Sequence, residues 1–224
     1  DETAYNKVTV GNFYTTKDGI TNGVNGLYST LRGMYIQEYL IYMCEGPSDI
    51  WIGHQGHEQW YNWTIDATNA DVRSFWYSCY KSVNQCNAVI ESLENNDIPG
   101  LDEDLKTRFL AESLFIRAHY FYHLVQQFGD IPMPLKPTNS VETTAHKTKV
   151  DEVWNQIVTD LEFAVENLPE TYQASEFGHI TKYAAMHHLS RVYLTLKRSD
   201  DDLKKALNYA EQVINSGKYS LVKS

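Results

Sequence analysis

The sequence of 224 residues predicts an all-α fold, and two patterns in it support that prediction. Apolar residues recur every three or four positions in six segments, and no run alternates apolar and polar residues long enough to require a strand. Most of these segments begin at capping or acidic residues and end near Gly, Asn or Pro, which are typical helix start and stop signals. A chain of this length suits one domain, or at most two small ones, with a sizeable core.

The first helix is expected over residues 20–34, after a capping box formed by Thr15 and Asp18. Gly33 is expected to break or bend this helix, because glycine has the largest backbone entropy cost among helical residues. A further apolar stretch follows and ends near Cys44.

Two long helices are expected next, over residues 72–93 and from the acidic residues 102–104 to Phe128. The acids complement the positive end of the dipole of the second of these helices. Apolar residues cover several of its sides, so it is predicted to be the central helix, with Phe121 in the core. Its Arg117 is expected to bind carbonyl groups or a carboxylate of a neighbouring helix.

A long connection rich in Pro, Thr and Lys covers residues 129–148 and leads into another helix. Thr148 and Asp151 are spaced as a capping box at the start of that helix, and Pro169 marks its end.

The last two helices are expected over residues 185–196 and 203–217, the second of them capped by Ser199 and Asp202. They resemble a tetratricopeptide-type helical hairpin in size and in small-residue content, although the regular period of about 34 residues is absent. The sequence therefore predicts a single domain over residues 1–224, a degenerate tetratricopeptide-like stack of helical hairpins with six main helices and long loops. The small residues that allow close approach are Ala184, Ala185, Ala206 and Ala210.

The three cysteines are expected to be buried free thiols, which is how free Cys usually occurs. Cys79 and Cys86 lie seven positions apart, which on a helix is about 10 Å of rise. A disulfide joins Cα atoms no more than about 7 Å apart, so these two cannot pair within a helix. Cys44 is able in principle to pair with either of them.

The overall charge disfavours two classes of partner. The formal net charge is −10, and a surface of that sign repels nucleic acid and anionic lipid. The longest uninterrupted apolar run, residues 39–44, is far too short to cross a bilayer. No cationic and then apolar leader precedes Asp1, so we expect either no export or a signal removed upstream.

Catalysis is not predicted. The sequence lacks the G-x-S-x-G, P-loop and dinucleotide-binding motifs, so neither catalytic residues nor a cofactor are expected. Acidic residues concentrate at helix starts, at residues 102–104 and 200–202, where capping and the helix dipole explain them.

The histidines do not predict a metal site. The first group lacks the spacing of a zinc protease, and the second shares a helix face but lies among large apolar residues. The third is an adjacent pair whose rings point in different directions. These groups are His54 and His57 with Glu58, His119 with His123, and His187 with His188.

The candidate binding site is the loop over residues 46–70, which holds three of the five tryptophans. Flat rings pack on the C–H faces of a pyranose, while amides and carboxylates bind the hydroxyls at its edge. Two alternatives remain open: the rings fold inward and anchor the loop, or they form a surface that docks a protein. The candidate ligand-binding residues are Trp51, Trp60, Tyr61, Asn62, Trp63 and Asp66.

Several segments together resemble one family. Residues 111–125, AESLFIRAHYFYHLV, followed by Phe-Gly-Asp-Ile-Pro at 128–132, resemble the signature helix and exit turn of the SusD/RagB family. Residues 12–18, 75–90 and 153–185 resemble other family segments in the expected order. The chain is thus similar to these outer-membrane nutrient-binding lipoproteins of Bacteroidetes along nearly its whole length.

The resemblance implies a protein that binds glycans or oligosaccharides without chemistry and delivers them to a TonB-dependent SusC-like transporter. It also implies the extracellular face of the outer membrane, reached through an N-terminal lipid anchor that this sequence does not contain. The family has a helical N-terminal part and a more irregular half after it, so residues 1–224 are expected to be the helical part alone. The family places ring-stacking residues in the loop corresponding to 46–70. The alternative function is a helical-repeat adaptor that docks a protein or peptide through this aromatic loop.

Overall fold

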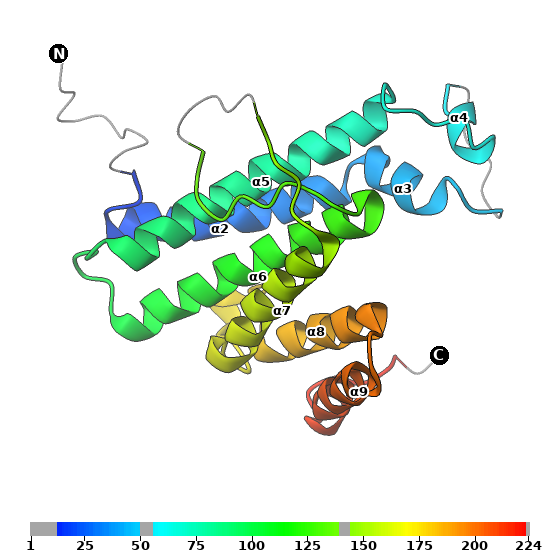
Figure 1. Cartoon of the computed structure of the whole chain (residues 1–224). Helices are drawn as coiled ribbons and strands as arrows, with labels where there is room; N and C mark the ends of the chain where they lie inside the picture. Colours follow the sequence, from blue (N-terminus) through cyan, green and yellow to red (C-terminus); the bar gives the residue numbers. More distant parts are fainter. Residues whose placement is uncertain (1–12, 50–55, 139–143, 223–224) are drawn as a thin grey trace, which may run out of the picture.

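The computed structural model describes residues 13–49, 56–138 and 144–222, and in these ranges the regular structure is helical (Figure 1). The described residues form no strand, and their one isolated antiparallel bridge joins Ile131 to Thr148. None of the helices in these ranges combines the length and apolar composition that crossing a bilayer requires. The prediction of an all-α fold is confirmed.

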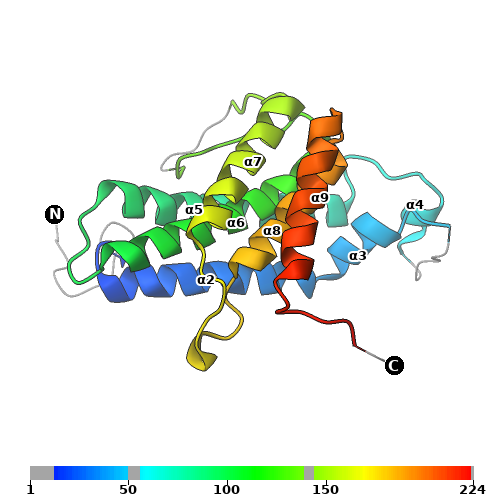
Figure 2. The same ribbon diagram turned by 90° about the horizontal axis from the view of Figure 1, so that it is seen from below.

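In the described residues the six main helices are α2 and α5 to α9, and from α5 onward each of them packs on the next along the chain. The long helices α2, α5 and α6 lie side by side, with α2 packed on both of the others (Figure 2). α7 crosses α6, and the α8–α9 hairpin completes the stack, while α3 and α4 extend beyond the end of α2. The helices are α2 (Lys17–Tyr35), α3 (Glu38–Glu45), α4 (Glu58–Tyr61), α5 (Ala70–Asn95), α6 (Glu103–Phe128), α7 (Val150–Asn167), η1 (Ala174–Glu176), α8 (Lys182–Leu196) and α9 (Asp200–Asn215).

α6 is the central helix, as its apolar composition predicts. Ile116, Tyr120 and Phe121 are fully buried, although Phe121 lies on a different side of the helix from the other two. α6 also buries two charged residues, Glu112 and Arg117. Charged side chains are almost never fully buried unless they are paired, so each must have a partner from another element.

The start of α2 differs from the prediction. Its N-cap is Thr16, whose hydroxyl accepts a hydrogen bond from the Gly19 amide at 3.1 Å, so the predicted cap at Thr15 is wrong by one residue. Gly33 neither breaks nor ends the helix, which continues to Tyr35. A glycine costs a helix only about 1 kcal/mol, and the fully buried Met34 holds this turn on the core.

The predicted capping box of Thr148 and Asp151 is also wrong. The amide of Val150 donates instead to Oδ1 of Asp130 at 3.0 Å, from the turn that ends α6. The bridge between Ile131 and Thr148 brings that carboxylate to the start of α7. A side chain 20 residues away therefore satisfies the orphan amide.

The α8–α9 hairpin follows the prediction. Ser199 caps α9 by accepting from the Asp202 amide at 3.3 Å, and Gly217 has the left-handed φ of 65° typical after a helix end. All three cysteines are free thiols, as predicted, but only Cys79 and Cys86 are buried. Cys44 is exposed, which corrects its predicted burial.

Candidate functional site

The predicted aromatic loop has one buried and one exposed tryptophan in its described part, and Trp60 is the buried, inner ring. Its side chain is 3% exposed, its Nε1 donates to Oδ2 of Asp71 at 3.1 Å, and its ring stacks with that of Tyr42. A ring buried in this way offers no face to a ligand. The structure therefore corrects the prediction for Trp60, which anchors the loop to α3 and α5.

Two more contacts make this anchor specific. The imidazole of His57 lies flat on the ring of Tyr42, with centroids 4.0 Å apart, and its Nδ1 is 3.4 Å from Asp71 Oδ2. The backbone of Gly46 passes so close to Trp60 that a Cβ there would lie 2.5 Å from the Tyr42 carbonyl oxygen and 3.0 Å from Trp60 Cβ. Only glycine fits at that position, so the packing of Trp60 depends on Gly46.

Trp63 is the outer ring, with 73% of its side chain exposed. It follows the C-cap of α4, Asn62, and has a left-handed φ of 58°. The amide of Thr64 donates back to the carbonyl of Gln59 at 3.0 Å, the six-to-one bond of a Schellman motif. Glycine is usual at this left-handed position, and an L-residue there costs about 1–2 kcal/mol.

The remaining predicted residues surround Trp63 in sequence. Tyr61 is half-buried, while Asn62 and Asp66 are exposed. Oδ1 of Asp66 accepts hydrogen bonds from the Thr68 hydroxyl at 2.6 Å and the Thr68 amide at 2.8 Å. These bonds lower the pKa of the Asp66 carboxyl, so it is ionised at neutral pH. Trp51 lies outside the described residues.

Metal coordination has no support in the described part of the chain. No group of three or more His, Cys, Asp or Glu residues in the described ranges has an arrangement that would hold a metal ion. His119 and His123 are half-buried on α6, while His187 is exposed and its neighbour His188 is buried.

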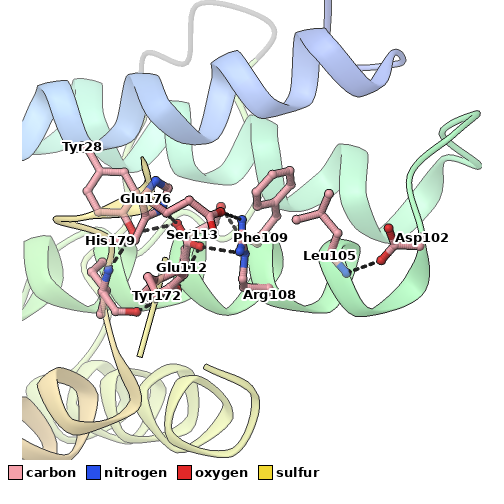
Figure 3. A network of polar contacts seen from close by, with 11 residues as sticks. Tyr28, Asp102, Leu105, Arg108, Phe109, Glu112, Ser113, Tyr172, Glu176 and His179 are labelled. Atoms are coloured by element: carbon pink, nitrogen blue, oxygen red, sulfur yellow. Dashed lines mark hydrogen bonds and ion pairs between the residues drawn. The ribbon is translucent and has the colours of Figure 1, made fainter. Parts of the chain in front are cut away.

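The structure also contains a buried polar cluster that the sequence did not predict, centred on Glu112 (Figure 3). Oε2 of this carboxylate accepts from the hydroxyl of Tyr28 at 2.6 Å and lies 2.9 Å from Nδ1 of His179. Oε1 accepts from Tyr172 at 3.3 Å and lies 3.4 Å from Nε of Arg108. The cluster joins α2 and α6 to the loop between α7 and α8.

The electrostatics of this cluster explain its composition. Glu112 is fully buried, and an unpaired carboxylate there would cost several kcal/mol. Burial and the nearby charge of Glu112 raise the pKa of both Tyr28 and Tyr172, so both hydroxyls stay protonated and remain able to donate. The sequence hinted at this arrangement only through the acidic Glu112 inside a largely apolar helix.

Comparison with known proteins now places the chain. Its stack of helical hairpins defines an α-helical, tetratricopeptide-like scaffold, and the exposed Trp63 lies on one of its loops. The chain belongs to the SusD-like family described as starch-binding and associating with the outer membrane, whose family model matches residues 3–194. The family resemblance seen in the sequence is confirmed.

Two curated relatives are both SusD-like proteins. One, from Bacteroides ovatus, is 26% identical, and the match covers 92% of this chain and 39% of the relative. The other, SusD-like protein P2 from Formosa agariphila, is 29% identical, over 91% of this chain and 40% of the relative. The chain therefore spans about two fifths of the length of these relatives.

Solved structures share the fold. A SusD-like protein from Bacteroides fragilis matches with a TM-score of 0.76 at 23% identity, over 94% of this chain and 40% of that one. A structure solved with a xylogluco-oligosaccharide has a TM-score of 0.81 at 23% identity, over 91% and 41% of the two chains. A laminarin-binding SusD-like protein has a TM-score of 0.76 at 24% identity, over 94% and 46%.

Proposed function

We propose that this chain takes part in the non-enzymatic binding of glycans or oligosaccharides and in their delivery to a TonB-dependent SusC-like transporter. Membership of a starch-binding family that associates with the outer membrane supports this proposal. So do the two fold neighbours whose names mention a xylogluco-oligosaccharide and laminarin. We also propose that the chain works on the extracellular face of the outer membrane, held there by a lipid anchor, as the helical part of a longer protein.

The exposure of the Trp63 indole is the main support for placing the binding site on this loop. Leaving an indole in water forfeits its hydrophobic burial, and the left-handed backbone adds a further cost of about 1–2 kcal/mol. Local strain of this kind persists where the surroundings hold it and is concentrated at ligand-binding positions. The anchored Trp60 three residues earlier provides such a hold, so the outer ring is presented on a fixed base.

The chemistry around Trp63 suits a sugar. The indole face packs on the C–H face of a pyranose, and hydroxyls at the ring edge need donors and acceptors. Asn62 supplies both, and Asp66 supplies an ionised carboxylate whose Oδ1 is fixed by Thr68, which leaves Oδ2 for a ligand hydroxyl. Tyr61 completes the proposed surface. A shallow site of this kind gives a Kd of about 10 μM to 1 mM.

Calorimetric titration of the chain with xyloglucan and laminarin oligosaccharides tests the proposal. We expect Trp63→Ala to raise the Kd at least ten-fold, and Trp63→Tyr to keep part of the affinity because it keeps a flat ring. Phe177→Ala is the matched control, because Phe177 is another strongly exposed aromatic residue on a different loop. It should leave the Kd unchanged, and all three variants should keep the far-UV spectrum of the parent.

Two results would contradict the proposal. If Trp63→Ala and Phe177→Ala change the affinity equally, the binding surface is not centred on Trp63. If no neutral glycan binds the folded chain, the glycan-binding assignment of this chain fails, and the adaptor alternative gains support.

A further inference from the structure

Two histidines of α6, His119 and His123, meet His188 of α8, which lies far from them in the sequence. The ring centroids of His119 and His123 are 4.7 Å apart, and those of His119 and His188 are 5.1 Å apart. Tyr35, at the end of α2, closes the group from a third helix, with its hydroxyl 2.8 Å from Nε2 of His119. The sequence did not predict this histidine cluster, because it depends on how α8 packs across α6.

A hollow of about 230 Å³ opens beside the cluster. Its lining combines apolar side chains with histidines, one tyrosine and one arginine. This volume is below the range of about 300–1,000 Å³ typical of drug-sized ligands, so it suits a single sugar ring rather than an oligosaccharide. The lining includes Leu31, Tyr35, Phe115, His119, His188 and Arg191.

The charge of this pocket is unusual for a chain with a net charge of −10. Within the described ranges, no carboxylate lies within ion-pair distance of the Arg191 guanidinium, which stacks over the ring of Tyr122 at 5.9 Å. Burial, the neighbouring imidazoles and Arg191 lower the pKa of His119 and His188, so both rings are neutral at pH 7. Arg191, itself exposed, therefore gives the edge of the pocket one positive charge that no described carboxylate pairs with.

The cluster also keeps an unused polar atom. Nε2 of His188 is buried and has no hydrogen-bond partner within the described part of the chain. Buried polar atoms nearly always have partners, so an exception beside a pocket indicates that a partner is missing. The ring of Tyr35 is fixed at the pocket by its bond to His119 and offers an aromatic surface there.

We propose that this pocket binds one hexuronate residue of an acidic glycan, with the sugar carboxylate paired to Arg191 and the sugar ring beside Tyr35. The planar fork of a guanidinium matches the two oxygens of a carboxylate, which favours a uronate over a neutral sugar. The inference rests on the proposed glycan-binding function and adds a second site and a ligand class to it. The site is separate in sequence from the surface around Trp63.

Nuclear magnetic resonance of the histidine side chains, during titration with D-glucuronate, locates and measures this binding. We expect saturable shifts of the His119 and His188 ring signals with a Kd of about 1 mM. D-Glucose should cause no shift at the same concentrations, and D-glucose 6-sulfate should bind more weakly than glucuronate. Trp63→Ala should leave the uronate titration unchanged, so the two proposed sites succeed or fail separately.

Variants of Arg191 test its role. Arg191→Gln should raise the Kd for glucuronate at least ten-fold. Arg191→Lys keeps the charge but loses the planar guanidinium, so its Kd should lie between those of the parent and Arg191→Gln. Lys204→Gln removes the same charge from an exposed position on α9 and should leave the Kd within two-fold. All variants should retain the parent far-UV spectrum.

Four outcomes would overturn the proposal. They are an absence of shifts with glucuronate, equal shifts with glucose, equal weakening by Arg191→Gln and Lys204→Gln, and tighter binding of the sulfate. The last would leave an anion pocket but remove the uronate assignment. Loss of neutral-glycan binding in Trp63→Ala, with uronate binding retained, supports this site independently of the first.

Discussion

Arg117 on α6 binds Asp160 on α7 through two parallel hydrogen bonds, from Nε to Oδ2 at 2.9 Å and from Nη2 to Oδ1 at 2.8 Å. Both side chains are buried, and Nη1 of the same guanidinium donates to Oδ1 of Asn87 on α5 at 3.1 Å. One arginine thus joins three consecutive helices of the stack. Arg117 was predicted to bind carbonyl groups or a carboxylate of a neighbouring helix, and the structure shows the carboxylate of Asp160 as its main partner.

Asp160→Asn should destabilise the fold strongly. The substitution leaves a buried guanidinium without its counter-charge, so we expect the free energy of unfolding to fall by about 3–5 kcal/mol in urea denaturation. Asp201→Asn is the control, because the Asp201–Lys205 pair on α9 is exposed and should change stability by less than about 0.5 kcal/mol. A cost below about 1 kcal/mol for Asp160→Asn would show that this pair does not hold the helices together.

The sequence was sufficient for features that depend on local pattern. The apolar residues on every side of the segment around Phe121 predicted a central helix, and a charged Arg117 within it predicted a partner on another helix. A local cap was predicted at Ser199, which accepts from the Asp202 amide, and was placed one residue too early at the start of α2, where Thr16 is the cap. It failed at α7, where the cap Asp130 comes from another turn.

The sequence could not predict which rings of the candidate loop are buried, because burial is decided by tertiary contacts. Trp60 and Trp63 lie three residues apart in the same polar and aromatic loop. Trp60 is nevertheless buried against Asp71, whereas Trp63 is exposed to solvent. The partners of Glu112 are likewise non-local: Tyr172 lies 60 positions away and His179 lies 67 positions away. No period or motif in one sequence indicates which loop folds back onto which helix.

Glu112→Gln should loosen the loop between α7 and α8. The amide keeps the shape of the side chain but removes the charge that Tyr28 and His179 contact, and hydrogen bonds to a charged group contribute about 1.5–3 kcal/mol. We expect a loss of that size in stability and faster chymotryptic cleavage after the exposed Phe177. Glu176→Gln removes the half-buried partner of Arg108 and should change both measurements less than Glu112→Gln. Equal effects of the two variants would contradict a special role for Glu112.

Truncation of the two tryptophans of the aromatic loop tests two different features, the burial of Trp60 and the left-handed backbone of Trp63. Trp60→Ala removes a buried ring and should cost about 3–5 kcal/mol of unfolding free energy. Trp63→Gly places the preferred residue at a left-handed position and should be more stable than Trp63→Ala by about 1 kcal/mol. Thermal and urea unfolding of the three variants measure both differences. If Trp63→Gly is the less stable of the two Trp63 variants, the left-handed conformation is not the one adopted in solution.

The histidine cluster should make the protein less stable in acid. Burial lowers the pKa of His123 to about 4 and of His188 to about 3, below the value of about 6.5 expected for the unfolded chain. Below pH 6.5 the unfolded state therefore binds more protons than the folded state, and stability falls as pH falls. The free energy of unfolding should have its full value above about pH 7. At pH 5 it should be lower by about 1–2 kcal/mol for each of these histidines.

His188→Phe isolates this effect, because phenylalanine keeps a ring in the core and removes the titrating nitrogens. We expect the variant to match or exceed the parent at pH 7, since it also removes the unpartnered Nε2, and to lose less stability between pH 7 and pH 5. His187→Gln, at the exposed neighbouring position, should retain the parent slope. Urea denaturation at both pH values measures the slopes. An identical slope in His188→Phe and the parent would mean that protonation of other groups causes the acid sensitivity.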